Sequence, residues 1–396
     1  MATWLNMAGT SFTFNNPDVE RVISGQGSIG KLVEEVERLG GTRALVLISP
    51  SVAKTFLLDK IKAGLGGKCA AVFDQVQPHS PTESIDKAVA VARDKKIDVL
   101  VSVGGGSAID TAKGVAALLA EGGALPRFGV RFSPPNKKEV PPMPAPKIPH
   151  IAIPTTLSGG EYSYSAGITE GGRKFIVADP KLAPRVVLLD PEAAATAPGR
   201  LLAASGMNSL AHCVEAVYST ETQPLTEAYC LAGIGLIARY LPRAVADHTD
   251  LEALSHVQVA ACLSGMGVYS AWTGIHHAIV HVIGGRYKAP HAEIHALMLP
   301  YGMRWNLDVV ERHYLRMARE IGIEAANEKE LAAAVPEYVY GMNQKMGLPL
   351  KLRDLGVPKD GLKQLSVDAL GDYSIHTNPK PVRSAEQVLE VLEAAW

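Results

Sequence analysis

Short β-branched runs alternate with amphipathic segments from Val19 to Val103, and this alternation constrains the fold more than any other feature of the sequence. The runs read VERVIS, RALVLIS, CAAVFDQV and DVLVSV, and the segments between them have a helical period. Strands that are apolar along their whole length are typical of a parallel sheet buried on both faces. The N-terminal part is therefore predicted to be a doubly wound α/β domain of the nucleotide-binding type.

A glycine-rich turn, GGGS at residues 104–107, follows the strand DVLVSV and opens the helix SAIDTAKGVAALLA, which carries Asp110. Glycines let a diphosphate approach the backbone, and the helix N-terminus offers free N–H groups and a positive dipole end. The turn is therefore predicted to bind a dinucleotide pyrophosphate. The alternative is a tight turn whose glycines serve close packing only.

Residues 125–154 are rich in proline and have no helical period, which predicts a long surface excursion. A short apolar strand then runs into Thr155 and Thr156 and a loop of small residues up to Gly160. Hydroxyl groups and glycines at the carboxyl end of a strand suit the phosphates or ribose of a cofactor. An ordinary polar hairpin is the alternative. The run RVVLLDP is predicted to be the last strand of the sheet.

After Asp190 the pattern is helical only, so the second domain is predicted to be all-α. With 396 residues the chain exceeds the roughly 250–300 residues that one core usually supports. We therefore predict two domains, a dinucleotide-binding α/β domain at 1–190 and a helical domain at 191–396. The first long helix of the second domain carries Asn208 and His212 four residues apart on one face.

The stretch 274–300 holds five of the twelve histidines and is predicted to be an active site. His277 and His281 are four residues apart, so they project from the same face of a helix. The Gly-Gly pair at 284–285 is expected to loosen or end that helix, and the next segment then brings His291 back toward the first two rings. Core histidines satisfied by the backbone are the alternative, but an apolar helix has no packing use for so many polar rings.

The composition excludes several classes of function. Lysine and arginine (39) nearly balance aspartate and glutamate (40), so the basic field that binds nucleic acid is missing. No run approaches the ~18 apolar residues of a membrane span. The first sixteen residues lack a basic n-region and a sustained apolar core, and the four cysteines are dispersed. A cytoplasmic protein without a signal peptide, nucleic-acid partner or membrane partner is expected.

Four segments in this order resemble the iron-dependent (group III) alcohol dehydrogenase family: GGGSAIDTAK, PTTLSGGE, SGMNSLAHCVEA and HHAIVHVIGGRYKAPHAEIHALMLP. The likeness extends from about Val22 to beyond Leu299. It implies an active site in the cleft between the two domains, NADH or NADPH as cofactor, a divalent metal (Fe or Zn) and a homodimer. In the family an aspartate and three histidines hold the metal, and these positions fall on Asn208, His212, His277 and His291.

The same resemblance assigns the other candidate site residues. His281 is expected to lie nearest the nicotinamide and to move the proton, while His276 and His277 belong to the cluster that polarises the substrate oxygen. Ser49 stands where many relatives have an aspartate that binds the adenosine ribose, so a 2′-phosphate is not repelled and NADPH should be accepted. The residues expected to contact the cofactor are Ser49, Gly105, Gly106, Ser107, Asp110, Thr155, Thr156, Ser158 and Lys174.

The sequence around Asn208 and the segment PHAEIHALMLP most resemble the maleylacetate reductases, which reduce an unsaturated oxo dicarboxylic acid with NADH or NADPH. An amide at Asn208 in place of a carboxylate is expected to weaken metal binding, so that the enzyme holds less than one equivalent and stays active after chelation. Partly protonated imidazoles would then attract a carboxylate-bearing substrate.

The leading hypothesis is thus an NAD(P)H-dependent reductase of a small, anionic oxo compound. A metal-dependent dehydrogenase acting on a neutral alcohol or aldehyde is the first alternative. A lyase of the dehydroquinate-synthase type and a non-catalytic dinucleotide sensor are further alternatives, the second because the metal site lacks its carboxylate.

Overall fold

The computed structural model describes residues 11, 12, 14, 19–133, 137–287 and 289–396. Most of the N-terminal stretch assessed for a signal peptide lies outside the described residues. The described residues form two compact units. One, the nucleotide unit, comprises those from 19 to 202 with 246–262; the other, the histidine unit, comprises 203–245, 263–396 and residues 11, 12 and 14. The boundary predicted after residue 190 stays a prediction.

The nucleotide unit is built on a six-stranded sheet in which all neighbouring strands are parallel, in the order β3-β2-β4-β7-β10-β1. This arrangement confirms the predicted doubly wound sheet, and RVVLLDP supplies its last strand. The strands are β1 (Arg21–Ser24), β2 (Ala44–Ile48), β3 (Cys69–Phe73), β4 (Val99–Gly104), β7 (His150–Pro154) and β10 (Val186–Leu189).

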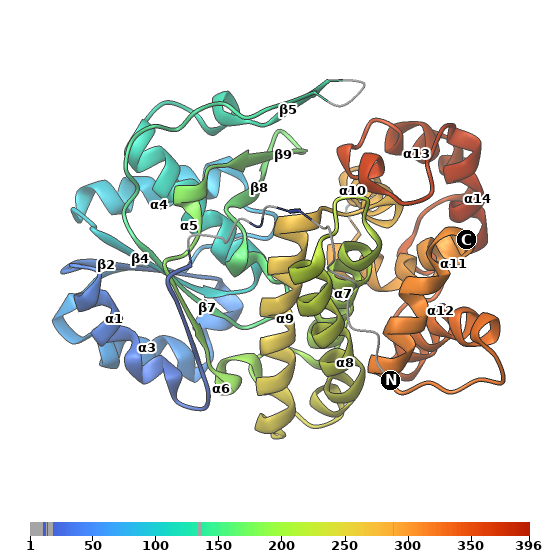
Figure 1. Ribbon diagram of the computed structural model, residues 1–396. Coiled ribbons are helices and arrows are strands. Elements are labelled where there is room, and N and C mark those ends of the chain that lie inside the picture. The colour runs from blue at the N-terminus through green and yellow to red at the C-terminus, as the bar shows by residue number, and fades with distance from the viewer. Residues whose placement is uncertain (1–10, 13, 15–18, 134–136, 288) are drawn as a thin grey trace. The chain divides into compact units, whose positions relative to one another are not determined.

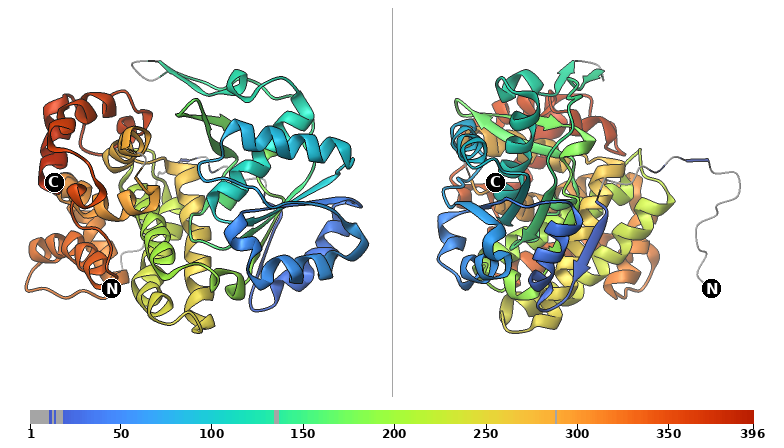
Figure 2. Two further views of the ribbon diagram at one scale, coloured as in Figure 1. Left: turned by 180° about the vertical axis from the view of Figure 1, so that it is seen from behind. Right: turned by 90° about the vertical axis from the view of Figure 1, so that its left-hand side faces the viewer.

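Helices cover both faces of this sheet (Figure 1). On one face lie α1 (Leu32–Arg38) and α3 (Phe56–Leu65), and on the other α4 (Thr82–Asp94) and α5 (Gly106–Glu121). Side chains alternate along each strand, so every second residue of β2 packs toward α1 and α3 and the others pack toward α4 and α5. All five residues of β2 are fully buried, which explains the continuous apolar run. Figure 2 shows the same two layers from behind.

The direction of winding reverses between β2 and β4. The chain passes from β2 outward to β3 and then returns to place β4 on the other side of β2. In open α/β sheets, ligands bind beyond the carboxyl ends of the strands at such a reversal. Ser49 follows β2 and Gly105 follows β4, so the two cofactor candidates flank this point.

The proline-rich segment contains more regular structure than its sequence indicates. It includes a short 3₁₀ helix at Leu125–Phe128 and an antiparallel pair, β5 (Arg131–Ser133) with β6 (Lys137–Glu139). A second antiparallel pair, β8 (Ser165–Glu170) with β9 (Arg173–Ala178), follows the loop after Thr156. Hydrogen bonding between short strands accounts for both ribbons, and periodicity does not reveal strands of three residues.

Beyond Asp190 the described residues contain helices and no strand, as predicted. Among the described residues, no helix combines the length and apolar character needed to cross a membrane. The helices are α6 (Pro191–Ala194), α7 (Gly199–Tyr218), α8 (Pro224–Ala246), α9 (Leu251–Ala271), α10 (Ile275–Tyr287), α11 (His291–Ile321), α12 (Glu328–Lys345), α13 (Leu362–Ala369) and α14 (Ala385–Ala395).

One local expectation was wrong. The Gly-Gly pair at 284–285 does not end its helix, because α10 continues through it to Tyr287. A Cβ atom on Gly284 would stand 3.7 Å from Nδ1 of His291. That separation is an ordinary van der Waals contact, so the side chain of His291 does not by itself require a glycine at this position.

Candidate active site

The glycine turn after β4 lies against the loop that follows β7. The backbone N–H of Thr155 donates to the carbonyl of Gly104 at 3.0 Å, and a Cβ on Gly105 would stand 2.9 Å from Oγ1 of Thr156. Gly105 is the N-cap of α5, and no side chain caps that helix. Gly105 has a φ of −82°, and Gly104, at 146°, is the residue of this turn with a positive φ. Close approach to Thr156 is what demands glycine at 105.

The space in front of the turn suits a diphosphate. A Cβ on Gly106 would find Oγ of Ser158, at 3.6 Å, as its nearest neighbour, so the backbone there is open. Within the described residues, Oγ of Ser158 is buried without a hydrogen-bond partner. An open backbone at a helix N-terminus with an unpaired hydroxyl nearby matches the donors that phosphate oxygens need.

A strained loop that sequence reasoning missed lies beside Ser107. The N–H of His79 donates to Oγ of Ser107 at 3.1 Å, and Oγ of Ser80 donates to the Ser107 carbonyl at 3.1 Å. His79 and Ser80 have φ angles of 64° and 46°, which non-glycine residues rarely adopt. Strain of this kind gathers at ligand sites. No pattern in the sequence reveals two successive left-handed residues.

Two residues of α5, Asp110 and Lys113, form hydrogen bonds with the backbone of the segment that follows Thr156. The buried ammonium of Lys113 donates to the carbonyls of Gly160 and Ser165, at 2.8 Å each. The carboxylate of Asp110 accepts from the N–H of Gly167 at 3.0 Å. Asp110 therefore has a structural partner besides any cofactor. Two other candidates lie nearby in the fold: Lys174 is on β9 beside Asp110, and Ser49 caps the short helix Pro50–Ala53.

A second group of candidates lies in the histidine unit, where three helices each bring two residues spaced four apart. These are Asn208 and His212 on α7, His277 and His281 on α10, and His291 and His295 on α11. The ring centroids are 5.1 Å apart for His212 and His277 and 6.3 Å for His281 and His291. The structure thus gathers the predicted histidines into one cluster.

Glu215, which sequence reasoning missed, holds two of these rings. It is fully buried on α7, and its Oε2 accepts from Nδ1 of His277 and lies 3.1 Å from Nδ1 of His276. Burial raises the pKa of Glu215, but the two imidazoles outweigh it and hold that pKa below its ordinary value. His277 therefore carries its proton on Nδ1, which leaves the Nε2 lone pair available for a ligand. The sequence offered one signal for Glu215, namely its position three residues after His212 on the same helix.

His281 has a carboxylate partner of its own. Its Nδ1 lies 2.9 Å from Oδ2 of Asp372, just before the short 3₁₀ helix Tyr373–Thr377. Burial raises the pKa of Asp372, but His281 and the Ser374 N–H lower it further, so the carboxylate stays ionised. The pairing directs Nε2 of His281 away from Asp372. The two residues are 91 positions apart, so no local signal connects them.

Burial disfavours the charged form of three rings in the cluster, which counts against partly protonated imidazoles at these positions. Burial lowers the pKa of His277 to about 4, and it lowers the pKa values of His212 and His295 well below the ordinary value. The apolar surroundings disfavour the charged form, and neighbouring imidazoles add to the effect. Neutral imidazole is the form that binds a divalent metal.

The donor set fits a metal. Within the described residues, Oδ1 of Asn208 and Nδ1 of His212 are buried without a hydrogen-bond partner. Nδ1 of His277 is held by Glu215, in the carboxylate–histidine arrangement that orients metal ligands. The nucleotide-loop candidates and the histidine cluster belong to different compact units, and the predicted cleft between domains stays an expectation.

Comparisons with known proteins bear on both units. Residues 19–191 match the family described as iron-containing alcohol dehydrogenase, and residues 202–396 match its C-terminal part. The chain belongs to the iron-containing alcohol dehydrogenase family. It is therefore an NAD(P)-dependent dehydrogenase or reductase, as the resemblance implied.

Individual relatives match more than nine-tenths of the chain. A maleylacetate reductase of Cupriavidus pinatubonensis is 31% identical over 92% of both chains, and a lactaldehyde reductase of Escherichia coli is 31% identical over 94% of this chain and 97% of its own. Among solved structures, 1,3-propanediol oxidoreductase superposes with a TM-score of 0.89 at 28% identity and covers 98% of this chain and 100% of its own. Maleylacetate reductase from Agrobacterium tumefaciens gives 0.82 at 26% identity and covers 98% of each.

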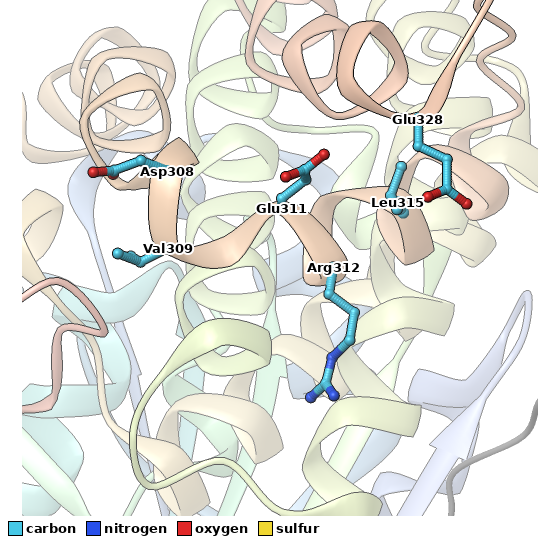
Figure 3. Close-up of a pocket in the computed structure, with 6 residues that line it drawn as sticks. All are labelled: Asp308, Val309, Glu311, Arg312, Leu315 and Glu328. Carbon is cyan, nitrogen blue, oxygen red and sulfur yellow. The ribbon is translucent and has the colours of Figure 1, made fainter.

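A surface pocket elsewhere on α11 is not a rival site. Figure 3 shows its lining, three carboxylates, one guanidinium and two aliphatic side chains. It begins thirteen residues beyond His295 on the same helix, about 20 Å along the axis. One of its carboxylates, Asp308, is already paired with Lys380 at 3.0 Å. The lining residues are Asp308, Val309, Glu311, Arg312, Leu315 and Glu328.

The glycine turn yields the first prediction. Gly106→Val should leave the melting temperature close to that of the wild type, because a Cβ has room there, but it should weaken NADPH binding by about 10-fold or more by obstructing the phosphates. Gly105→Val is the contrast: it clashes with Thr156 and should lower the melting temperature as well. Fluorescence titration and thermal unfolding measure both. Unchanged NADPH affinity in folded Gly106→Val would remove this turn from the cofactor site.

A buried carboxyl group in the loop that follows Thr156 yields the second prediction. Neither oxygen of Glu161 has a hydrogen-bond partner among the described residues, and burial raises its pKa from 4.5 to about 7. Between these values the unfolded chain releases a proton that the folded protein retains, so stability should fall as pH rises, by an amount on the order of 3 kcal/mol. Glu161→Gln should match the wild type at pH 4.5 and melt higher at pH 8. An equal melting temperature at pH 8 would contradict this account.

Proposed function

We propose that this enzyme reduces a small, anionic oxo compound with NADH or NADPH, and that maleylacetate is the first substrate to test. The carrying observation is the cluster in which His281 is held by Asp372 beside neutral metal-ligand candidates. Three further points support it: the maleylacetate reductases among its relatives, Asn208 in place of a carboxylate, and no acid at Ser49 to repel NADPH.

In this proposal a bound reduced nicotinamide supplies the hydride, and a bound divalent metal supplies a Lewis acid for the carbonyl oxygen. The residues proposed to hold the metal are Asn208, His212, His277 and His291. Asp372 fixes the His281 ring so that Nε2 faces away from the carboxylate and holds the proton that the product oxygen receives. Glu215 fixes His276 and His277 in the same way.

The cofactor role is proposed for the loops at the switch point of the sheet. Gly105, Gly106 and Ser107 receive the diphosphate at the N-terminus of α5. Thr155, Thr156 and Ser158 line the neighbouring loop, and Ser49 faces the adenosine ribose without a carboxylate to exclude a 2′-phosphate. A cytoplasmic homodimer is part of the same proposal and is supported by the composition and the resemblance alone.

A second candidate function is the metal-dependent reduction of a neutral aldehyde. It is favoured by the lactaldehyde reductase of Escherichia coli, which is as similar to this chain as the maleylacetate reductase is. The two candidates differ in substrate charge, so they predict different responses to a carboxylate on the substrate.

The test is a spectrophotometric assay of NADH and NADPH oxidation with maleylacetate, short oxo acids and short neutral aldehydes. The proposal expects a kcat/KM for maleylacetate at least about 10-fold above that for any neutral aldehyde, because a charged partner adds binding energy of this size. Higher kcat/KM for lactaldehyde or propanal would favour the second candidate. No oxidation of either cofactor, although both bind, would favour a dinucleotide sensor.

The His281–Asp372 pair yields the next prediction. His281→Ala should lower kcat by about 100-fold or more, the usual contribution of a general acid, and should leave NADPH affinity unchanged. Asp372→Asn should lower kcat by a smaller factor, because the ring remains but loses its ionised partner. Steady-state kinetics and NADPH titration measure both. If His281 served only in packing, His281→Ala would lower the melting temperature and leave the kcat of the folded enzyme near that of the wild type.

A further inference from the structure

Trp272, in the turn between α9 and α10, has a backbone conformation that a bulky side chain rarely adopts. Its φ is 61°, and it is the largest of the four non-glycine residues with a positive φ in the described part of the chain. For such a residue a positive φ is an outlier that persists only where surrounding contacts enforce it. Because such strain is concentrated at functional sites, the contacts of the indole ring indicate what it serves.

The indole ring reaches the proposed proton donor through one tyrosine. It packs edge-on against the ring of Tyr373, with the ring centroids 5.5 Å apart and the planes at 82°. The Tyr373 ring in turn lies 6.2 Å from the imidazole of His281, tilted by 33°. Both separations are within the range of about 4.5–7 Å over which aromatic rings interact. Trp272 and Tyr373 are partly exposed, so packing in an apolar core is an incomplete account of the strain.

The short helix that positions the carboxylate partner of His281 also positions Tyr373. Asp372 is the N-cap of the 3₁₀ helix Tyr373–Thr377, and its Oδ1 accepts from the N–H of Ser374 at 2.9 Å. Its Oδ2 lies 2.9 Å from Nδ1 of His281. Two successive residues therefore contact the same imidazole, Asp372 through a hydrogen bond and Tyr373 through its ring.

The hydrogen bond to Asp372 does not by itself fix the plane of the His281 ring. The torsion about the Cβ–Cγ bond of histidine is broad, so a single bond at Nδ1 permits the ring to tilt. Two neighbouring rings restrict this tilt: Tyr373, and His291, whose ring is parallel to that of His281 at 6.3 Å. The side chain of His281 is still 26% exposed, so removal of the Tyr373 ring would leave the imidazole room to move.

We propose that Tyr373 is a positioning residue for His281 and that Trp272 supports the ring of Tyr373. This inference rests on the proposed function, in which His281 holds the proton for the product oxygen. The two aromatic rings keep the imidazole plane fixed, so that Nε2 keeps its direction. A displacement of about 1 Å at a reacting group can lower a rate by about 100-fold, so these rings affect kcat without touching substrate. The positive φ of Trp272 is the strain that places the indole against Tyr373.

The test separates the ring contact from the backbone strain. Trp272→Ala and Trp272→Gly both remove the indole, but only glycine relieves the positive φ. Both should lower kcat by about 10-fold with KM and NADPH affinity unchanged, although Trp272→Gly should melt higher than Trp272→Ala. Tyr373→Leu should lower kcat at least as much, and Tyr373→Phe, which keeps the ring, should stay within about 3-fold of the wild type. Tyr340→Leu is the matched control, because that ring packs on Tyr301 instead, and its kcat should equal that of the wild type.

A second measurement needs no substrate. In protein labelled with ¹⁵N-histidine, the proton on Nδ1 of His281 is identified by the loss of its signal in His281→Ala. This proton is bonded to Asp372, so its signal should be sharp in the wild type and in Tyr373→Phe. In Tyr373→Leu and in both Trp272 variants the signal should broaden, because a mobile ring exchanges this proton with water faster.

A broad signal in the wild type, or an equally sharp one in the folded Trp272 and Tyr373→Leu variants, would overturn the inference. So would a kcat that falls only in proportion to the loss of folded protein, since the two rings would then serve only the packing of the turn. If Tyr373→Leu does not fold, the two Trp272 variants decide. The kcat of His281→Ala tests the proposed function, whereas the proton signal needs no turnover, so the two failures are distinguishable.

Discussion

The buried carboxylate of Glu215 is the interaction on which the histidine unit depends. A charged group removed from water is strongly destabilising unless hydrogen bonds compensate for the lost solvation. Here the compensation comes from His276 and His277, the first histidines of α10, so α7 and α10 must pack with these rings facing Glu215. A Cβ on Gly274 would stand 3.0 Å from the other oxygen of Glu215, so the residue that leads into α10 has to be small. Folding and preparation of the site are thus the same event.

In the nucleotide unit, buried charged groups are stabilised in other ways than Glu215 is. Lys113 is a buried cation whose partners are mainly backbone carbonyls, and Glu161 is a carboxyl that burial moves toward its neutral form. Burial also lowers the pKa of Lys113, although Asp110 and Glu161 oppose this. Lys113 and Asp110 hold the segment after Thr156 through the carbonyls of Gly160 and Ser165 and the N–H of Gly167. The loop after Thr156, which is proposed to bind the cofactor, is therefore fixed by hydrogen bonds to buried charged groups as well as by its buried side chains Leu157 and Tyr162.

The sequence correctly predicted the features that depend on residues close together in the chain. The strands, the glycine turn at the start of α5 and the i, i+4 histidine pairs all follow from spacing within one element, and the structure has them. Features that depend on distant residues were missed. Asp372 reaches His281 from 91 positions away, and the left-handed His79 and Ser80 arise from tertiary packing. The Gly-Gly pair was also expected to loosen or end its helix, but α10 continues through both glycines despite their low helix propensity.

The connection between α9 and α10 shows how such distant contacts act together. Trp272 has a φ of 61°, a conformation whose cost is about 1–3 kcal/mol for a residue with a side chain. Contacts on its C-terminal side hold the turn: the carbonyl of Thr273 accepts from Oγ1 of Thr377, and the N–H of Ile275 donates to Oδ1 of Asn378 at 3.1 Å. These two partners end the segment that begins with Asp372. One C-terminal segment therefore both fixes the turn that delivers the first histidines of α10 and orients His281, so the geometry of the cluster requires the chain nearly to its end.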